Sequence, residues 1–282
     1  FAGAVSCNRF LDREPMSSVS PEVYYKTAAQ LEADLNDEYP NILPSYGQWT
    51  YGIFGEDSGT ANQIRTDAND RYTSDRWKVP HSEGSNWNFE RIYRVNFLLS
   101  KVLPKFGEDM SGLQNTIVGD IPTIKHYIGE AYFLRAYEYF RKLQLFGDFP
   151  IIKDPLPDDK EALREASRRY PRNEVARFIL SDLDKACEYM ADTDMATTRI
   201  NKDAALLIKS RVALFEATWL QNFKGTAFVP GGEGWPGAAL YGNYEYPSGS
   251  LENEVKYFLE QAAEASGTVA EKYKGSLTEN TG

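Results

Sequence analysis

Apolar side chains recur at every third or fourth position in six stretches of the chain, which is the spacing of one face of an α-helix. Ser20 followed by Pro21 is a typical helix start, because serine caps the first turn and proline fits its first position. Gly147 is a typical helix end, because glycine tolerates the backbone conformation that follows the last turn. The helices predicted in this way are residues 20–39, 86–102, 121–146, 173–190, 202–220 and 251–274.

The helix expected over residues 121–146 is apolar over most of its circumference. Its charged side chains fall within one arc of roughly 140°, formed by Glu130, Arg135, Glu138, Arg141 and Lys142. The remaining surface carries aromatic and small side chains, including Ala131 and Ala136. Such a helix must be covered by neighbours on two sides. We therefore interpret most of its aromatics as packing contacts between helices, namely Tyr132, Phe133, Tyr137 and Phe140.

Two stretches show no helical period: residues 40–85, rich in Gly, Asn, Asp, Ser and Thr, and residues 221–250, rich in Gly, Pro and Tyr. Helices that follow one another as antiparallel pairs, sandwiched by neighbours, are typical of a solenoid. The strict tetratricopeptide consensus is absent and the spacing is irregular. The sequence predicts a mainly α fold of tetratricopeptide-like stacked helix pairs with long irregular loops and few short strands. The DFPII segment after Gly147 is expected to be extended and strand-like.

Length and charge limit the classes of function. The chain has 282 residues, enough for one large domain or two small ones. Its 31 basic and 41 acidic residues give a net charge of −10. This charge disfavours nucleic acids and anionic membranes as partners, because both require a basic face. No apolar run approaches the length of a membrane span.

The sequence gives little support for a catalytic site or a metal site. The two histidines, His81 and His126, are far apart, which disfavours a Ser-His-Asp set. Carboxylate pairs such as Asp67 and Asp70 are expected by chance in so acidic a chain, so they do not indicate glycoside hydrolysis. The segment DANDRYTSD starts like a calcium loop, but Arg71 stands at a ligand position and the loop glycine is missing. We expect no enzyme activity, no metal and no cofactor.

The two cysteines lie in different surroundings. Cys7 ends the small, apolar segment FAGAVSC and precedes the polar NRFLDREP, as at the cleavage and acylation site of a bacterial lipoprotein. An ordinary exposed cysteine on a frayed end is the alternative. Cys187 shares a helical apolar stripe with Ile179 and Leu183, which favours a buried thiol. Neither cysteine suggests a disulfide or a metal site.

Segments spread over nearly the whole chain resemble, in order, the motifs of the SusD/RagB family. The hallmark motif of that family is similar to GEAYFLRAYEYFRKLQLFGDFPII. The next two helical motifs are similar to SRRYPRNEVARFILSDLDKACEYM and RINKDAALLIKSRVALFEATWL. An earlier helix of the family resembles WNFERIYRVNFLL, and its lipidated start resembles CNRFLDREP. On these motifs the chain is identified as a member of the SusD/RagB family and matches its N-terminal, helical-repeat part.

The resemblance implies a domain organisation and a location. Residues 1–6 would be a signal-peptide remnant, residues 7–19 a lipoprotein tether, and residues 20–282 the helical-repeat domain, without the C-terminal half of the family. Two positions depart from the family pattern. Trp87 is offset by about two positions from the usual tryptophan, and Ala4 stands where the lipid-attachment motif usually has leucine. The implied location is the outer membrane, as a cell-surface lipoprotein.

The resemblance also implies a function. Such proteins are surface lipoproteins of Bacteroidetes that bind a glycan, or in some cases peptides. They sit as a lid on a TonB-dependent outer-membrane transporter of the SusC type, and they are binding proteins rather than enzymes. We therefore expect a glycan-binding component of an importer for oligo- or polysaccharide. A peptide-binding, RagB-like component remains an alternative, as does a helical scaffold that docks the transporter and has no ligand site of its own.

The candidate binding site is the loop over residues 45–85, where aromatic and polar side chains are interleaved. Sugar rings stack on Trp and Tyr, and their hydroxyls need polar partners. In the starch-binding relative, an Asp and an Arg of this loop and a Trp after it contact sugar. The candidates are Asp57, Arg65 and Trp77, which match those residues by order and spacing, with Trp49 and Tyr72 as alternate stacking platforms. Loop anchoring by the two tryptophans is the competing interpretation, and the Tyr-rich segment 235–246 is the second candidate site.

Overall fold

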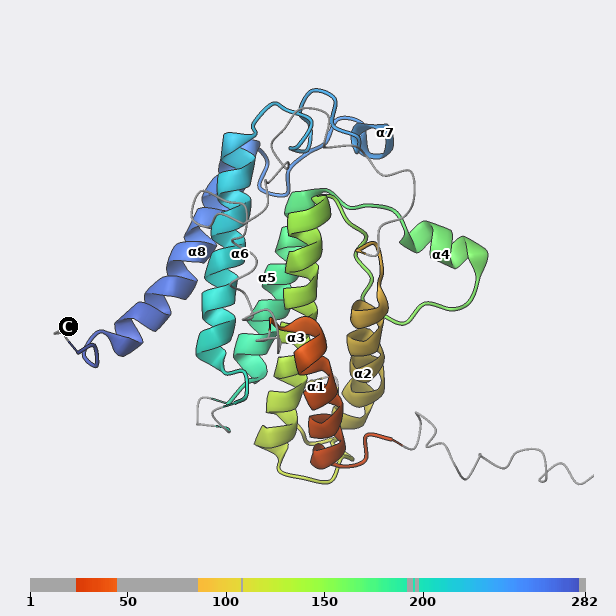
Figure 1. Ribbon diagram of the computed structural model, residues 1–282, viewed down its shortest axis with the longest axis vertical. Coiled ribbons are helices and arrows are strands. Elements are labelled where there is room, and N and C mark those ends of the chain that lie inside the picture. The colour runs from red at the N-terminus through yellow and green to blue at the C-terminus, as the bar shows by residue number, and fades with distance from the viewer. Residues whose placement is uncertain (1–23, 45–85, 108, 192–194, 196–197, 279–282) are drawn as a thin grey trace, which may run out of the picture.

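The computed structural model describes residues 24–44, 86–107, 109–191, 195 and 198–278. Within these residues the fold is mainly α, as the sequence predicts, with eight helices and no strand (Figure 1). The helices are α1 (Ala28–Ile42), α2 (Glu90–Phe106), α3 (Ile121–Phe146), α4 (Lys160–Ala166), α5 (Arg172–Tyr189), α6 (Lys202–Asn222), α7 (Ala238–Tyr241) and α8 (Leu251–Tyr273). The two short helices, α4 and α7, are not predicted by the sequence pattern.

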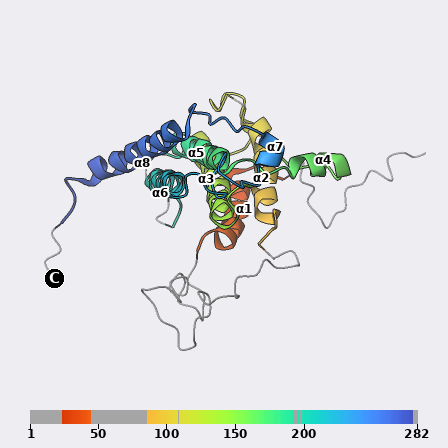
Figure 2. The ribbon, with the colours of Figure 1, turned by 90° about the horizontal axis from the view of Figure 1, so that it is seen from above.

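Helix α3 lies at the centre of a stack of long helices. It packs against α1 and α2 on one side and against α5 on the other, while α6 packs on α5 and α8 on α6. Seen from above, α5, α6 and α8 lie to one side of α3, and α2 lies to the other (Figure 2). The central helix of the stack is therefore the one that the sequence marks as apolar on most of its surface.

Helix α1 begins later than its sequence pattern predicts. Tyr25 has a positive φ of 57°, which interrupts any helix passing through it. The helix starts instead after Thr27, which forms a capping box with Gln30. The backbone just before this cap pairs with Val118, whose carbonyl accepts the Ala28 N–H at 2.9 Å. The Ser20–Pro21 start is therefore wrong for this helix.

Helix α3 has the boundaries that the sequence predicts. Asp120 caps its start by accepting the Thr123 N–H at 3.0 Å, and Gly147, with a φ of 67°, ends it. The chain then leaves in an extended conformation, as expected for DFPII. Its pairing is limited to one antiparallel bridge between Phe149 and Tyr170, so this segment is not a strand.

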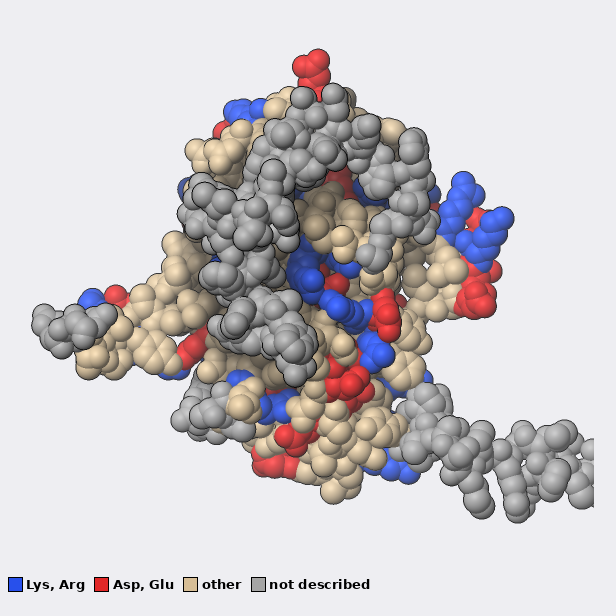
Figure 3. Space-filling view, viewed as in Figure 1, with Lys and Arg blue, Asp and Glu red and all other residues tan. Residues whose placement is uncertain are grey.

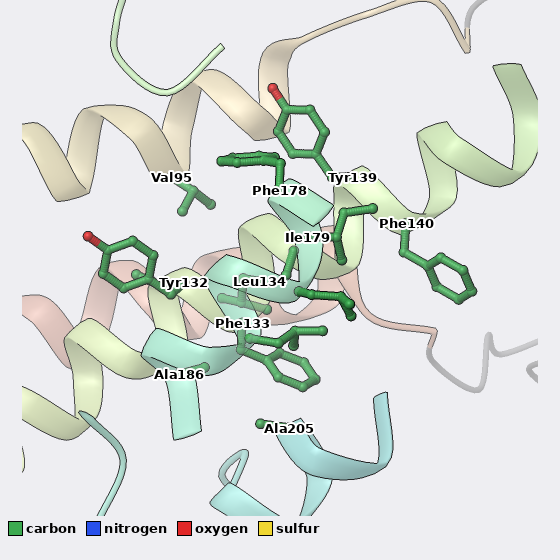
Figure 4. Packing of buried hydrophobic residues seen from close by; sticks show 14 of the residues in the cluster. Val95, Tyr132, Phe133, Leu134, Tyr139, Phe140, Phe178, Ile179, Ala186 and Ala205 are labelled. Carbon is green, nitrogen blue, oxygen red and sulfur yellow. The ribbon is translucent and has the colours of Figure 1, made fainter. Parts of the chain in front are cut away.

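Gly129 lets α3 and the end of α5 approach closely. Ala131 and Ala136 are fully buried, and a Cβ atom added at Gly129 would lie 3.0 Å from the Met190 Cγ. Around them, the large rings of α3 contact the neighbouring helices (Figure 4). Tyr132, Phe133 and Phe140 are buried and Tyr137 is partly buried, which confirms their interpretation as packing contacts.

Candidate functional site

The residues that the sequence nominates for function lie outside the part of the chain that the structure describes. These residues are Cys7 for lipidation and Trp49, Asp57, Arg65, Tyr72 and Trp77 for glycan binding. The second candidate, the Tyr-rich segment 235–246, is described in full. The contacts of its aromatic side chains therefore show whether they are free to bind a ligand.

Most aromatic side chains of the Tyr-rich segment are engaged in packing. Trp235 is buried and donates its indole N–H to Asp148 at 2.7 Å. The Tyr244 hydroxyl lies 2.9 Å from a carboxylate oxygen of Glu174 at the start of α5, and Tyr246 donates to the Pro230 carbonyl at 2.5 Å. Burial, together with the nearby carboxylates, raises the pKa of the Tyr244 hydroxyl well above its usual value. These rings fix the loop before α8 onto the end of the helical stack.

One ring of this segment, Tyr241, lines a cleft instead. The cleft has a volume of about 600 Å³ and lies between α4 and α7. The Tyr241 hydroxyl donates to the Arg169 carbonyl at 2.9 Å, and burial raises its pKa to about 12. The described residues that line this cleft are Ala162, Glu165, Ala166, Arg168, Tyr170, Leu240 and Tyr241.

A larger cleft, with a volume of about 710 Å³, adjoins it and shares Ala166 and Tyr170 with it. One wall is the extended segment 151–156, and the opposite wall is α5. Its described lining is Ile151, Ile152, Lys153, Asp154, Leu156, Ala166, Tyr170, Glu174, Arg177, Phe178, Ser181 and Pro247. We call the two clefts together the Tyr170 groove. It combines aliphatic and aromatic surface with side chains of both charges.

The motif helix α3 fixes one wall of the Tyr170 groove. Arg135 is buried and binds Asp182 of α5 with two nitrogens, Nε at 2.7 Å and Nη2 at 2.9 Å. Its Nη1 donates to the Lys153 carbonyl at 3.1 Å. Tyr139 accepts the N–H of Ile152 at 2.8 Å. The charged arc of α3 is therefore covered as well as its apolar surface, and it positions the segment that leaves the helix.

A second charged residue of α3, Glu130, joins three parts of the chain. It accepts a hydrogen bond from Tyr39 of α1 at 2.9 Å and pairs with Arg199 before α6. His126 lies one turn away, with Nε2 3.0 Å from a Glu130 oxygen. Since His126 Nδ1 accepts the Ala191 N–H at 3.1 Å, the proton of a neutral ring lies on Nε2, where it can donate to Glu130. His126 is therefore a packing residue.

Two further arginines connect the later helices. Arg172 binds Glu216 of α6, with Nη2 to Oε2 at 2.8 Å, and lies 4.1 Å from the centre of the Trp219 ring. Arg177 binds Glu254 of α8, with Nε to Oε1 at 2.7 Å. The sequence pattern did not predict these contacts. The available signal for them was the presence of charged residues inside apolar helical stretches. Each long helix from α3 to α8 is thus joined to another helix of the stack, either by a largely buried ion pair or by direct apolar packing.

Residues 9–214 match the model of the SusD-like_3 family, described as "Starch-binding associating with outer membrane". The chain belongs to the SusD-like family. Its relatives include SusD-like protein P2 of Formosa agariphila, 27% identical over 228 residues that cover 78% of this chain and 42% of that protein. SusD-like protein P38 of the same organism is 25% identical over 217 residues, which cover 74% of this chain and 39% of that protein.

A solved SusD homolog from Bacteroides thetaiotaomicron has the same helical arrangement. It covers 89% of this chain and 42% of its own length, with a TM-score of 0.50 and 20% sequence identity. This chain therefore spans about two fifths of the length of the SusD-like proteins it matches. Among the helices that the structure describes, none is long and apolar enough to cross a membrane. The described residues also hold no cluster of three or more His, Cys, Asp or Glu side chains suited to a metal ion.

Proposed function

We propose that this chain is the helical part of a cell-surface component of a SusC/SusD-type nutrient importer. In this role it captures an oligo- or polysaccharide and delivers it to a TonB-dependent outer-membrane transporter. It acts by binding and carries out no reaction. The observation that carries the proposal is the match of residues 9–214 to a family described as starch-binding and associated with the outer membrane.

We place the primary glycan site on the loop over residues 45–85. Trp77 is the proposed stacking platform, and Asp57 and Arg65 are the proposed hydroxyl partners; Trp49 and Tyr72 are alternate platforms. The described Tyr-rich segment supports this choice indirectly, because Trp235, Tyr244 and Tyr246 are engaged in packing.

The test is a glycan array on the complete chain, followed by titration calorimetry with the glycan that binds best. Trp77→Ala and Asp57→Ala should each weaken binding several-fold, while the helical circular dichroism is unchanged. Tyr93→Ala is a matched control, since Tyr93 is an exposed aromatic on α2. If both loop variants bind like the parent, the loop is not the site. If the parent binds peptides or only the transporter, a peptide-binding component or a docking scaffold replaces the proposal.

We also propose that Cys7 is acylated and holds the protein at the cell surface. The small residues before it and the polar segment after it fit a lipoprotein cleavage site. Expressing cells would be labelled with an alkynyl fatty acid, and the parent would be compared with Cys7→Ala. Label should be lost in the variant. Equal labelling of both proteins would exclude Cys7 as the attachment point.

A further inference from the structure

We propose that the Tyr170 groove is a second glycan subsite, separate from the 45–85 loop, and that it takes a neutral oligosaccharide. The inference rests on the proposed glycan-binding function and adds a place and a ligand class to it. The groove consists of two adjoining clefts of about 710 and 600 Å³ that share Tyr170. A site in which one aromatic residue lies between two clefts suits a ligand made of several linked sugar rings.

Tyr170 is the proposed stacking platform. Its side chain is exposed, with 39% of its surface accessible, while its backbone is held by two hydrogen bonds to Phe149, at 3.0 and 3.1 Å. The ring is therefore presented from a fixed point of the chain. The C–H faces of a sugar ring pack on such an aromatic face, and the phenol oxygen stays available for a hydroxyl.

Polar side chains surround this platform at the rim. Lys153 and Asp154 lie on the extended wall, and Ser181 lies on the α5 wall, all three exposed. Glu174 uses one carboxylate oxygen, Oε1, for the Tyr244 hydroxyl. Sugar hydroxyls both donate and accept hydrogen bonds, so an ammonium, two carboxylates and a hydroxyl at one rim can all serve as their partners.

The charges of the groove favour a neutral ligand. The larger cleft is lined by Lys153, Asp154, Glu174 and Arg177, and Arg177 is already paired with Glu254 of α8. In the smaller cleft Arg168 and Glu165 form an ion pair at 2.9 Å. Charges of both signs are likewise mixed on α4, at the edge of the molecule (Figure 3). A groove with charges of both signs offers little net attraction to a polyanion or a polycation.

The extended wall is unsuited to binding a peptide as an added strand. Strand addition requires a row of free backbone groups along one edge. Here both backbone groups of Ile152 are engaged, because its N–H donates to Tyr139 at 2.8 Å and its carbonyl accepts from Asn96 at 2.8 Å. The Lys153 carbonyl accepts from Arg135. The same contacts make the wall rigid, so little conformational entropy is lost on binding.

The experiment is titration calorimetry on the complete chain with three neutral probes: maltoheptaose, cellohexaose and mannohexaose. For the probe that binds, Tyr170→Ala should raise the dissociation constant about fivefold or more. Tyr170→Phe keeps the ring and should raise the constant less than Tyr170→Ala does, because at most one hydrogen bond is lost. Tyr93→Ala removes an exposed aromatic outside the groove and should have no effect. Circular dichroism verifies that each variant is folded.

The outcomes separate this inference from the function on which it rests. If a probe binds the parent and Tyr170→Ala binds it equally well, the groove is not a subsite, and the proposed function stands. If neither the probes nor a glycan array detect any binding by the parent, both are overturned. If an uncharged, unstructured peptide binds with the same dependence on Tyr170, the groove is a peptide site and the glycan assignment is wrong.

Discussion

The charged side chains of the α3 motif act as connectors between helices. Arg135, Glu130, Glu138 and Lys142 are all buried, and a buried charge is tolerated only when it is paired and hydrogen-bonded. Arg135 meets this condition with Asp182, Asn96 and a backbone carbonyl. Such pairs add little net stability compared with apolar packing. Removing one partner, by contrast, leaves an unpaired buried charge and is strongly destabilising.

The bidentate contact makes Arg135 sensitive to a change that conserves charge. Arg135→Lys should lower the free energy of unfolding by roughly 2 kcal/mol, because an ammonium cannot reproduce the planar pair of bonds to Asp182. Urea unfolding monitored by circular dichroism measures the difference. Arg141→Lys is the matched control on the same helix, because its side chain is 48% exposed. If both variants unfold at the same urea concentration, the guanidinium geometry is unimportant.

Cys187 is the other residue with a clear chemical expectation. Burial, aided by nearby Asp184, raises the pKa of its thiol to about 11. The thiolate is the reactive form, so Cys187 should react slowly with a disulfide reagent at pH 8 and quickly once the chain is unfolded in urea. Thiolate release followed by absorbance measures both rates. The Cys7→Ser variant removes the other cysteine from the signal, and equal rates in the two states would contradict the expectation.

At the scale of whole elements, α3 is enclosed on nearly every side. Its apolar surface meets α1, α2 and α5, and its charged arc is buried too, except for Arg141. A helix enclosed in this way has no free side onto which a larger residue could expand. Gly129 sets the spacing to the end of α5, and Ala131 and Ala136 are fully buried as well.

Overpacking α3 should therefore be costly. Ala136→Leu should reduce stability by about 1–3 kcal/mol, because the added atoms force off-rotamer side chains or a backbone shift. The thermal midpoint, measured by calorimetry, should fall by several degrees. Ala263→Leu on α8 makes the same substitution at an exposed position and should leave the midpoint nearly unchanged. An unchanged midpoint for Ala136→Leu would mean that α3 is not enclosed.

One carboxylate, Glu254, links α8 to α5. Burial of Glu254 by itself raises the pKa, but hydrogen bonds from Arg177, Asn173 and Ser248 outweigh it and hold the pKa below its usual 4.5. A depressed carboxyl pKa contributes stability that is complete above the unfolded value and is lost as the pH falls through the folded one. The attachment of α8 to α5 should therefore weaken below about pH 4.5.

Hydrogen exchange followed by mass spectrometry tests this expectation. Between pH 6 and pH 3, protection of the first turns of α8 in the parent should decline once the known pH dependence of the chemical exchange rate is removed. Glu254→Gln should show low protection already at pH 6 and a smaller further change. A protection factor that stays constant in the parent across this range would show that Glu254 does not control the attachment of α8.

At the scale of the whole molecule, the stack from α1 to α8 provides a rigid support, and the proposed ligand contacts lie on its loops and edges. The chain spans about two fifths of the length of its relatives. One stacking aromatic and a few hydrogen bonds, each worth about 0.5–1.5 kcal/mol net, support a dissociation constant from micromolar to millimolar. Calorimetry on the complete chain should return a constant in that range, and a nanomolar value would contradict the small contact set. Weak binding would fit the proposed transfer of the ligand to a transporter.

The sequence by itself determined the six long helices, apart from the start of α1, and the packing role of the α3 aromatics. Periodicity and a glycine stop at Gly147 are local signals, and the free energies they reflect arise within a few residues of each position. The motifs also indicated the SusD-like family correctly. Local signals were less reliable at α1, where Ser20–Pro21 has the composition of a helix start. There the contact with Val118 and the Thr27 cap selected a later position.

Only the tertiary structure decided which charges are buried, which partners they meet and where a groove forms. Arg135 and Asp182 are 47 residues apart in sequence, and Arg177 and Glu254 are 77 residues apart. A helical period assigns each side chain to a face, but it carries no information about the element that will cover that face. The Tyr170 groove likewise depends on segments brought together by the fold, because α4, α5 and α7 line it from positions separated along the chain.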